Sequence, residues 1–243
     1  LFWSSAENLV AGDTNGVADV FLKMLAGPNA GATYLISRTG AGAIGNGQSI
    51  DADFSPDGTR VVFFSVATNL GATGNSLLIK DVAAAYAGGD PSSGAVSRMV
   101  NQGFWATFSP DGTKVLYSNT QIYYVDIATA TTTVVSTNAA GAFGNAISQS
   151  PAWSHDGTKV TFLSTATNLV PGDTNGVIDV FVKTISGPGA GAIERVSVDE
   201  SGGQSNANSV FPAFSTTNNN LVAFETDANN LYVPHTGIGN DKF

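Results

Sequence analysis

Short runs of apolar and aromatic residues, separated by clusters of Gly, Asp, Asn, Ser and Thr, follow one another along the whole chain. Four of these runs come directly after a similar turn, at residues 61–64, 115–117, 160–163 and 221–224. Runs of this length that are rich in Val, Phe and Tyr and bounded by turn residues predict β-strands. No segment demands a helix. The Ala-rich stretch 82–87 is too short and uncapped to be stable alone, so we expect a loop insertion there.

The turn before these runs is a repeated signature. It reads Phe-Ser-Pro-Asp-Gly-Thr-Arg at 54–60, Phe-Ser-Pro-Asp-Gly-Thr-Lys at 108–114 and Trp-Ser-His-Asp-Gly-Thr-Lys at 153–159, with a weaker copy, Phe-Ser-Thr-Thr-Asn, at 214–218. Proline presets the backbone angle at the second position of a turn, and Asp-Gly supplies the rest of it. Each copy therefore predicts the end of one strand, a tight turn and the start of the next strand.

Each repeat contains two further strands. The third strands are expected at 19–23, 77–80, 122–125 and 179–183, and the fourth at 34–37, 96–100, 133–136 and 193–198. Four strands in a repeat of about 45 residues is the size of one β-propeller blade. The pattern therefore predicts an all-β chain, a β-propeller of four-stranded antiparallel blades.

The signature and the Phe-containing strand after it resemble the WD40-like repeat of TolB-type β-propellers. The resemblance covers essentially the whole chain and implies the propeller fold. It implies much less about function, because this repeat occurs in periplasmic scaffold proteins, in surface proteins and in accessory domains of peptidases and lyases.

The two ends of the chain fall inside blades of this pattern. Residues 1–10 align with 161–170, so the chain begins in a second strand, and its last residues align with a third strand. We expect one propeller domain over 1–243, with three complete and two partial blades at approximately 1–53, 54–107, 108–152, 153–213 and 214–243. Because a propeller closes to remove its edges, the chain is expected to be a fragment of a six- or seven-bladed ring. A five-bladed closure with a mismatched seam is the alternative.

The composition of the chain excludes some classes of binding partner. Only 12% of the residues are charged, and nineteen acidic against ten basic residues give a net charge of −9. This is the wrong sign for binding nucleic acid or an anionic membrane, and no apolar run is long enough to predict membrane insertion. The absence of cysteine excludes disulfides, cysteine-bound metals and thiol nucleophiles. An acidic surface suits a cation-binding protein, or simply keeps a secreted protein soluble.

An aspartate-rich loop occurs twice, as Gly-Asp-Thr-Asn-Gly-Val-Ala-Asp at 12–19 and Gly-Asp-Thr-Asn-Gly-Val-Ile-Asp at 172–179. Oxygen ligands at alternate positions with a Gly between them fit a hard cation such as Ca²⁺. The expected ligands are Asp13, Asn15, the Val17 carbonyl and Asp19, and likewise Asp173, Asn175, the Val177 carbonyl and Asp179. The alternative is that each loop is only an Asx turn leading into a strand. The equivalent loops at 71–75 and 235–241 have lost the first carboxylate, so at most two calcium sites are expected.

A second recurrence precedes the first, inner strand of each blade. It consists of asparagine and serine at fixed distances before the signature, namely Asn46 and Ser49, Asn145 and Ser148, and Asn206 and Ser209. Amides and hydroxyls at the mouth of a central channel could bind a glycan or a peptide. The alternative is that they cap the turns between blades.

Candidates for catalysis are few. The chain has two histidines, His155 and His235, and His155 takes the turn position that proline fills in the sister repeats. No Gly-x-Ser-x-Gly elbow, His-Glu-x-x-His motif or Gly-rich phosphate loop is present. The chain is therefore predicted not to be an enzyme. Its aromatic residues at blade-equivalent positions are expected in the core, whereas Trp3, Phe104, Trp105 and Tyr232 follow no repeat and are candidates for an exposed contact.

These observations predict a periplasmic or extracellular β-propeller that binds or scaffolds other proteins, with calcium stabilising its outer loops. Three alternatives remain open: an accessory propeller of a secreted hydrolase or lyase, a glycan-binding lectin-like propeller, and a structural subunit of a surface assembly.

Overall fold

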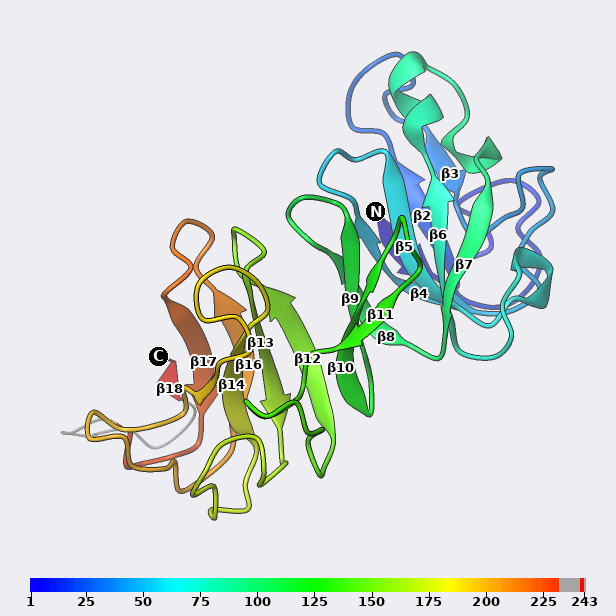
Figure 1. Ribbon diagram of the computed structural model, residues 1–243. Coiled ribbons are helices and arrows are strands. Elements are labelled where there is room, and N and C mark those ends of the chain that lie inside the picture. Colours follow the sequence, from blue (N-terminus) through cyan, green and yellow to red (C-terminus); the bar gives the residue numbers. More distant parts are fainter. Residues whose placement is uncertain (232–240, 243) are drawn as a thin grey trace. The chain divides into compact units, whose positions relative to one another are not determined.

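The computed structural model describes residues 1–231 and 241–242, and it is built almost entirely from antiparallel strands arranged in five sheets (Figure 1). Each sheet is a meander in which strands that follow each other in sequence pair with each other. The chain is an all-β propeller of four-stranded blades, as the strand pattern predicts.

The sheet that best represents a blade combines β4 (Ser49–Phe54), β5 (Arg60–Ser65), β6 (Ser76–Asp81) and β7 (Val96–Asn101). Its two middle strands are in continuous register from Arg60 opposite Asp81 to Ser65 opposite Ser76. The long insertion between β6 and β7 forms two short 3₁₀ helices, Ala83–Ala87 and Pro91–Ser93. The first has no side-chain cap at its N-terminus, as expected for this Ala-rich stretch.

A second complete sheet repeats this arrangement with β12 (Ser148–Trp153), β13 (Lys159–Ser164), β14 (Asp179–Thr184) and β15 (Ile193–Arg195). A third contains β8 (Phe104–Phe108), β9 (Lys114–Asn119), β10 (Gln121–Asp126) and β11 (Thr132–Val134). The link between β9 and β10 is short, because this repeat lacks the longer loop that joins β5 to β6 and β13 to β14.

Two sheets have three strands. One contains β1 (Phe2–Ser4), β2 (Asp19–Lys23) and β3 (Thr33–Leu35), and the other contains β16 (Ser209–Phe214), β17 (Val222–Thr226) and β18 (Asp241–Lys242). Phe2 pairs with Phe21 as Phe162 pairs with Phe181. The alignment of the first residues with a second strand is therefore confirmed.

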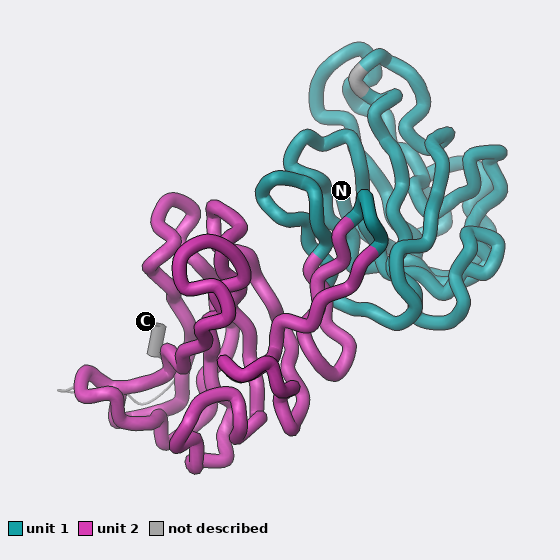
Figure 2. Tube along the Cα trace, in the orientation of Figure 1, with its two compact units in different colours: residues 1–115, 127–130 teal, residues 116–126, 131–243 magenta. Residues whose placement is uncertain are grey.

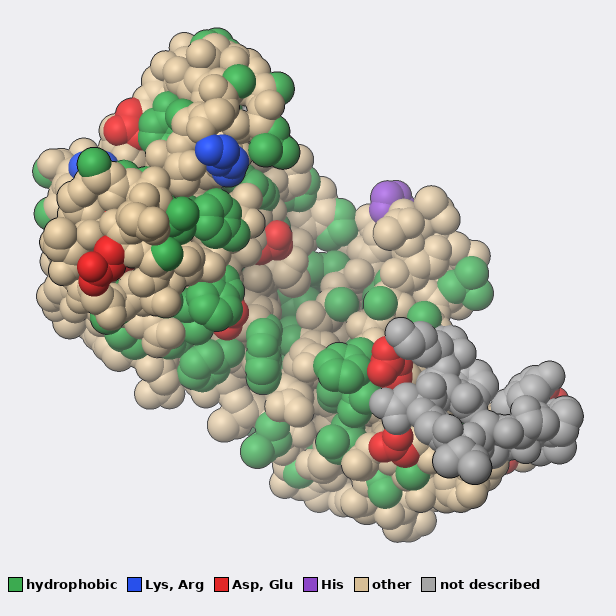
Figure 3. All heavy atoms as spheres, turned by 180° about the vertical axis from the view of Figure 1, so that it is seen from behind, with side chains coloured by type: hydrophobic (Ala, Val, Ile, Leu, Met, Phe, Trp, Pro, Cys, Tyr) green, Lys and Arg blue, Asp and Glu red, His purple; other side chains and the backbone are tan. Residues whose placement is uncertain are grey.

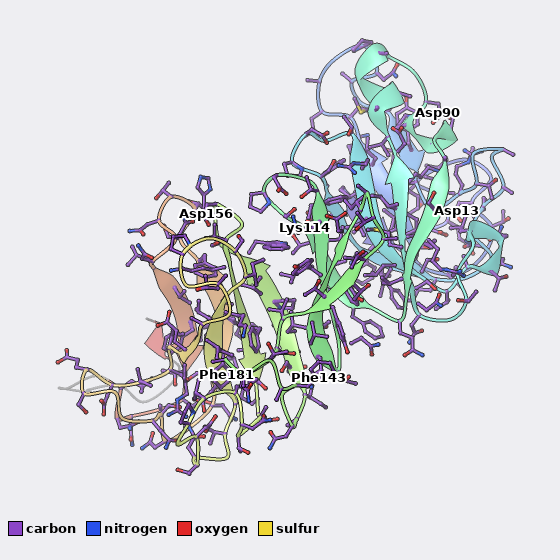
Figure 4. The ribbon with its side chains drawn as sticks, viewed as in Figure 1. Asp13, Asp90, Lys114, Phe143, Asp156 and Phe181 are labelled. Carbon is purple, nitrogen blue, oxygen red and sulfur yellow. The ribbon has the colours of Figure 1, made fainter. Side chains whose placement is uncertain are left out.

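The signature turns owe their shape to one repeated set of hydrogen bonds. Ser55 Oγ donates to Asp57 Oδ1 (2.6 Å), and the same carboxylate oxygen accepts from Thr59 N (3.0 Å) and Thr59 Oγ1 (2.8 Å). Gly58 takes a left-handed φ of 69°, which glycine adopts without strain. These bonds, with that from Ser55 first, lower the pKa of Asp57 to about 2. The turns at Asp111 and Asp156, the latter labelled in Figure 4, repeat the set.

The chain divides into two compact units, residues 1–115 with 127–130 and residues 116–126 with 131–243 (Figure 2). The boundary falls within β9. In the first unit the core is formed by apolar side chains of β2, β5 and β6 around Phe63, which is fully buried. In the described part of the second unit, one cluster lies around Phe162 and Phe181 and another around Val180 and Phe224. The aromatic residues that recur in the second strands thus pack in the core, as predicted.

Candidate functional site

The first aspartate-rich loop connects β1 to β2 and is closed by Asn15. Val17 N donates to Asn15 Oδ1 (3.1 Å), which forms an Asx turn. Asn15 Nδ2 donates to Asp19 Oδ2 (2.6 Å) and to the Gly45 carbonyl (3.0 Å). The amide nitrogen of Asn15 therefore faces Asp19, and the amide oxygen is used within the turn. Asn15 holds the loop together instead of presenting its oxygen to a cation.

The two carboxylates of this loop are buried. Asp19 is fully buried and its Oδ1 accepts from Ser37 Oγ (2.5 Å). Asp13 is 5% exposed, and its buried Oδ1 has no hydrogen-bond partner in the described structure. Burial raises the pKa of the Asp19 carboxyl, although the hydrogen bonds from Ser37 and Asn15 lower it. Burial also raises the pKa of the Asp13 carboxyl, and the nearby Glu7 adds to this shift. A buried carboxylate without a partner is costly unless a proton or a cation joins it.

The second loop, between β13 and β14, has the same closure. Asn175 Nδ2 donates to Asp179 Oδ2 (2.9 Å) and to the Ser205 carbonyl (3.1 Å), and Ser197 Oγ donates to Asp179 Oδ1 (2.5 Å). The Asx turn through Val177 N is longer, at 3.4 Å. The frame of the loop is thus reproduced in both copies.

The second loop differs in holding an arginine. Arg195 Nη1 lies 3.0 Å from Asp173 Oδ1 and 3.5 Å from Asp179 Oδ2, and all three side chains are buried. Burial raises the pKa of Asp173 despite this guanidinium. The guanidinium of Arg195 therefore already lies between the two carboxylates that were expected to bind calcium. Arg195 follows the loop by many residues in sequence, so the motif alone did not reveal it.

Metal-binding groups are not preassembled. Within the described residues, no three acidic or histidine side chains lie close enough together to hold a metal ion. Most of the degenerate loop at 235–241, including His235, lies outside the described residues. The calcium sites therefore stay a prediction. The two loops differ in that only the second contains a buried arginine.

The asparagines before the inner strands form reciprocal pairs. Asn46 N donates to Asn69 Oδ1 (2.9 Å), Asn69 N donates to Asn46 Oδ1 (3.3 Å) and Asn46 Nδ2 donates to Thr68 Oγ1 (2.8 Å). The backbone nitrogens of Asn145 and Asn206 likewise donate to Asn168 Oδ1 and Asn230 Oδ1, and their Nδ2 atoms donate to Thr167 Oγ1 and Asn229 Oδ1. Their own Oδ1 atoms accept from Thr167 N and Asn229 N. Their amides join two loops of one blade, which fits the expectation that they cap turns.

The serines of the same recurrence are buried. Ser49 bonds Ser65 (2.9 Å), Ser148 bonds Ser164 (3.0 Å) and Ser209 bonds Thr226 (3.0 Å), each between the hydroxyl oxygens. All three are at most 1% exposed. They cross-link the first and second strands of their blades, so they do not face solvent as a ring of ligand-binding hydroxyls would.

The inner strands carry a feature that the sequence analysis missed. In four blades the residue three positions before the signature aromatic has a left-handed backbone: Asp51 (φ 51°), Trp105 (φ 50°), Ser150 (φ 53°) and Phe211 (φ 52°). In the strands β4, β12 and β16 the pairing register shifts at this point, which marks a β-bulge. Non-glycine residues in this conformation are strained, and such strain recurs at ligand-binding and other functional sites.

Two of these strained positions display large aromatic side chains. Trp105 is 50% exposed and Phe211 is 71% exposed, although both lie within strands. Trp3, another candidate for an exposed contact, is exposed, whereas Phe104 is partly buried and stacks on Phe64 with ring centroids 5.1 Å apart. Tyr232 lies outside the described residues.

The surface carries few charges. Figure 3 shows one face on which acidic and basic side chains are sparse and scattered among neutral ones. His155 is exposed in its turn, at the position that proline fills in the sister repeats. In the described part of the chain, no helix has the length and apolar character needed to cross a membrane.

No family model and no curated protein matches the chain. Solved β-propeller structures do match it. A protein assigned as TolB from Agrobacterium tumefaciens has a TM-score of 0.53 and 19% identity, over 87% of this chain and 64% of that one. An oligogalacturonate lyase in complex with manganese has a TM-score of 0.50 and 15% identity, over 70% of this chain and 43% of that one. This chain thus spans less than two thirds of either structure, and its fold is that of a TolB-type β-propeller.

Proposed function

We propose that this chain belongs to an exported, non-enzymatic β-propeller that binds another protein through its inner strands and uses calcium to stiffen an outer loop. The observation that carries the binding role is the repeated bulge, because a strained backbone is kept in four blades while the side chain on it changes. A constant frame with variable side chains is what a binding surface needs.

Trp105 and Phe211 are the anchors of this proposal. Large aromatic side chains that stay exposed are over-represented at protein interfaces and supply much of the binding energy there. Each is presented by a strand paired within its own sheet, so little conformational entropy is lost when a partner binds.

We propose export because of the affinity expected for the calcium site. Sites with few carboxylates bind Ca²⁺ at about 10⁻⁴–10⁻³ M, which is the range of extracellular modules. Such a site would be filled in the periplasm or outside the cell. The absence of cysteine is compatible with either compartment.

Peptide-library panning tests the binding role. A phage-displayed random peptide library would be panned on the wild-type chain, and enriched peptides would be measured against Trp105→Ser, Phe211→Ser and the control Leu25→Ser. Leu25 is 89% exposed and lies in the loop between β2 and β3, outside the inner strands. We expect each inner-strand variant to weaken the peptides that contact it by about tenfold or more, as loss of an interface anchor does, with Leu25→Ser unchanged.

Peptides that bind all four proteins equally would remove the inner strands as the binding surface. A glycan array on the wild-type chain provides a second readout. Strong glycan binding that is lost with Trp105→Ser, without any peptide binding, would replace the protein partner with a lectin-like function. Turnover of oligogalacturonate by the purified chain would overturn the non-enzymatic proposal.

A further inference from the structure

The two aspartate-rich loops can be compared position by position, because their strands are in the same register. Phe21 of β2 pairs with Leu35, and Phe181 of β14 pairs with Arg195. Leu35 therefore occupies the strand position at which Arg195 stands in the other copy. The serines that donate to the two buried aspartates, Ser37 and Ser197, are equivalent as well.

The second loop is neutralised by the protein itself. One nitrogen of Arg195 reaches both Asp173 and Asp179, and it also donates to Gln204 Oε1 (3.1 Å). Gln204 Oε1 in turn accepts from the backbone nitrogens of Thr174 and Asn175, both at 3.0 Å. The guanidinium is thus built into the loop and takes the place of an external cation.

The first loop has no such neutralisation. Leu35 is apolar and 2% exposed, and no described lysine or arginine forms an ion pair with Asp13 or Asp19. Asp13 Oδ1 is left buried without a partner. Negative charge is also greater here, because Glu7 stands where the second copy has Thr167. A carboxylate oxygen of Glu7 lies 3.7 Å from the point where a Cβ on Gly16 would be.

We infer that the 12–19 loop alone binds a divalent cation, calcium, and that Arg195 replaces this cation in the 172–179 loop. The inference deepens the calcium part of the proposed function and rests on it. Asp13 Oδ1 is the first ligand, and Asp19 adds the lone pairs not used by Ser37 and Asn15. Glu7 is exposed and adds negative charge beside the loop, near Gly16.

The remaining ligands are waters and backbone carbonyls, since Ca²⁺ takes six to eight oxygens. Asn15 is a positioning residue, because its amide nitrogen faces Asp19. This assignment places two buried carboxylates around one cation and explains why a carboxylate oxygen can stay buried without a hydrogen-bond donor. Ca²⁺ is favoured over Mg²⁺ because a flexible set of carboxylates and waters suits its larger, less demanding coordination shell.

Calorimetric titration with calcium chloride tests the inference through its stoichiometry. We expect one Ca²⁺ per wild-type chain, none for Asp13→Asn and one for the matched variant Asp173→Asn. Leu35→Arg should abolish binding by supplying the missing guanidinium. Arg195→Leu should raise the stoichiometry toward two, a gain that a misfolded variant would not produce.

Other outcomes overturn the inference in distinguishable ways. Two calcium ions on the wild type would refute the role of Arg195. Loss of binding in Asp173→Asn but not in Asp13→Asn would place the site in the 172–179 loop instead of the 12–19 loop. Either result would leave calcium binding itself intact. Absence of binding to the wild type would refute both this inference and the calcium part of the proposed function, while peptide binding at Trp105 and Phe211 is measured independently.

Discussion

Lysines on the third strands show how single residues join loops to the sheets. Lys80 is fully buried, and its Nζ donates to the Arg38 carbonyl (2.5 Å) in the segment after β3. Lys183 occupies the same position in its blade, where it donates to the carbonyls of Thr137, Asn138 and Gly191. Each lysine thus satisfies carbonyls that have no partner in a strand ladder. Burial is the main reason that the pKa of Lys80 falls to about 8, with the nearby Arg38 adding to it and Asp90 opposing it.

This burial makes the stability of the fold depend on pH. The pKa of Lys80 falls from 10.5 to about 8 on folding, so between these values the unfolded chain binds more protons than the folded one. The free energy of unfolding therefore gains a contribution that rises with pH over this interval. We expect Lys80→Met to lose that contribution in urea unfolding measured from about pH 7 to about pH 10. Lys23→Met, which changes the exposed lysine at the equivalent position, is the control, and a wild-type slope in Lys80→Met would contradict the expectation.

Residue-level chemistry was predicted only in part by the sequence. The spacing of Asp13, Asn15 and Asp19 located a loop with two buried carboxylates, because turn residues and closing aspartates are local features. It could not reveal that the Asn15 amide turns its nitrogen toward Asp19, or that Arg195 reaches the second loop. The Asn15 amide is also oriented by the distant Gly45 carbonyl, and Arg195 is placed by the pairing of β15 with β14, so both contacts form only on folding.

At the scale of elements, the strands were predictable and the bulges were not. The strands follow from runs of β-branched and aromatic residues bounded by the signature turns. The left-handed position of the inner strand is occupied by Asp51, Trp105, Ser150 and Phe211, which share no chemical character and include no glycine. A sequence signal for positive φ is normally glycine or asparagine, so nothing marked this position in advance.

The left-handed backbone at Ser150 predicts which substitutions there stabilise the fold and which destabilise it. Glycine adopts φ near 53° without strain, whereas a β-branched residue there is strongly disfavoured. We expect Ser150→Gly to raise the free energy of unfolding by about 1 kcal/mol and Ser150→Val to lower it by about 1–2 kcal/mol. Urea denaturation measures both. A Ser150→Val protein as stable as the wild type would show that this position is not left-handed in solution.

At the scale of the whole molecule, repetition made the fold predictable. Three clear copies of one signature specify the blade, and the likeness to solved propellers agrees with that prediction. How the blades close into a ring could not be predicted in the same way. Ring closure depends on the number of blades, and a single repeat does not encode this number. The expected six- or seven-bladed ring therefore stays a prediction.

The net charge of −9 gives a prediction for the chain as a whole. Nucleic-acid binding draws most of its affinity from lysine and arginine on phosphates, and charged side chains are sparse on the face shown in Figure 3. We expect no shift of a duplex DNA fragment in a gel assay, even at about 50 mM salt, where such binding is strong. Retention of the DNA that weakens as salt is raised would show a basic surface that the composition does not predict.

The asparagines that latch the aspartate-rich loops give these loops a finite chemical lifetime. Asn15 and Asn175 are each followed by glycine, the neighbour that least obstructs attack of the next backbone nitrogen on the side-chain amide. Deamidation would replace the nitrogen that Asn15 directs at Asp19, 2.6 Å away, with a negatively charged oxygen. Two carboxylates would then face each other across the latch, and the loop would open. Ageing of the protein in storage would thus act on the same asparagines that close the two loops.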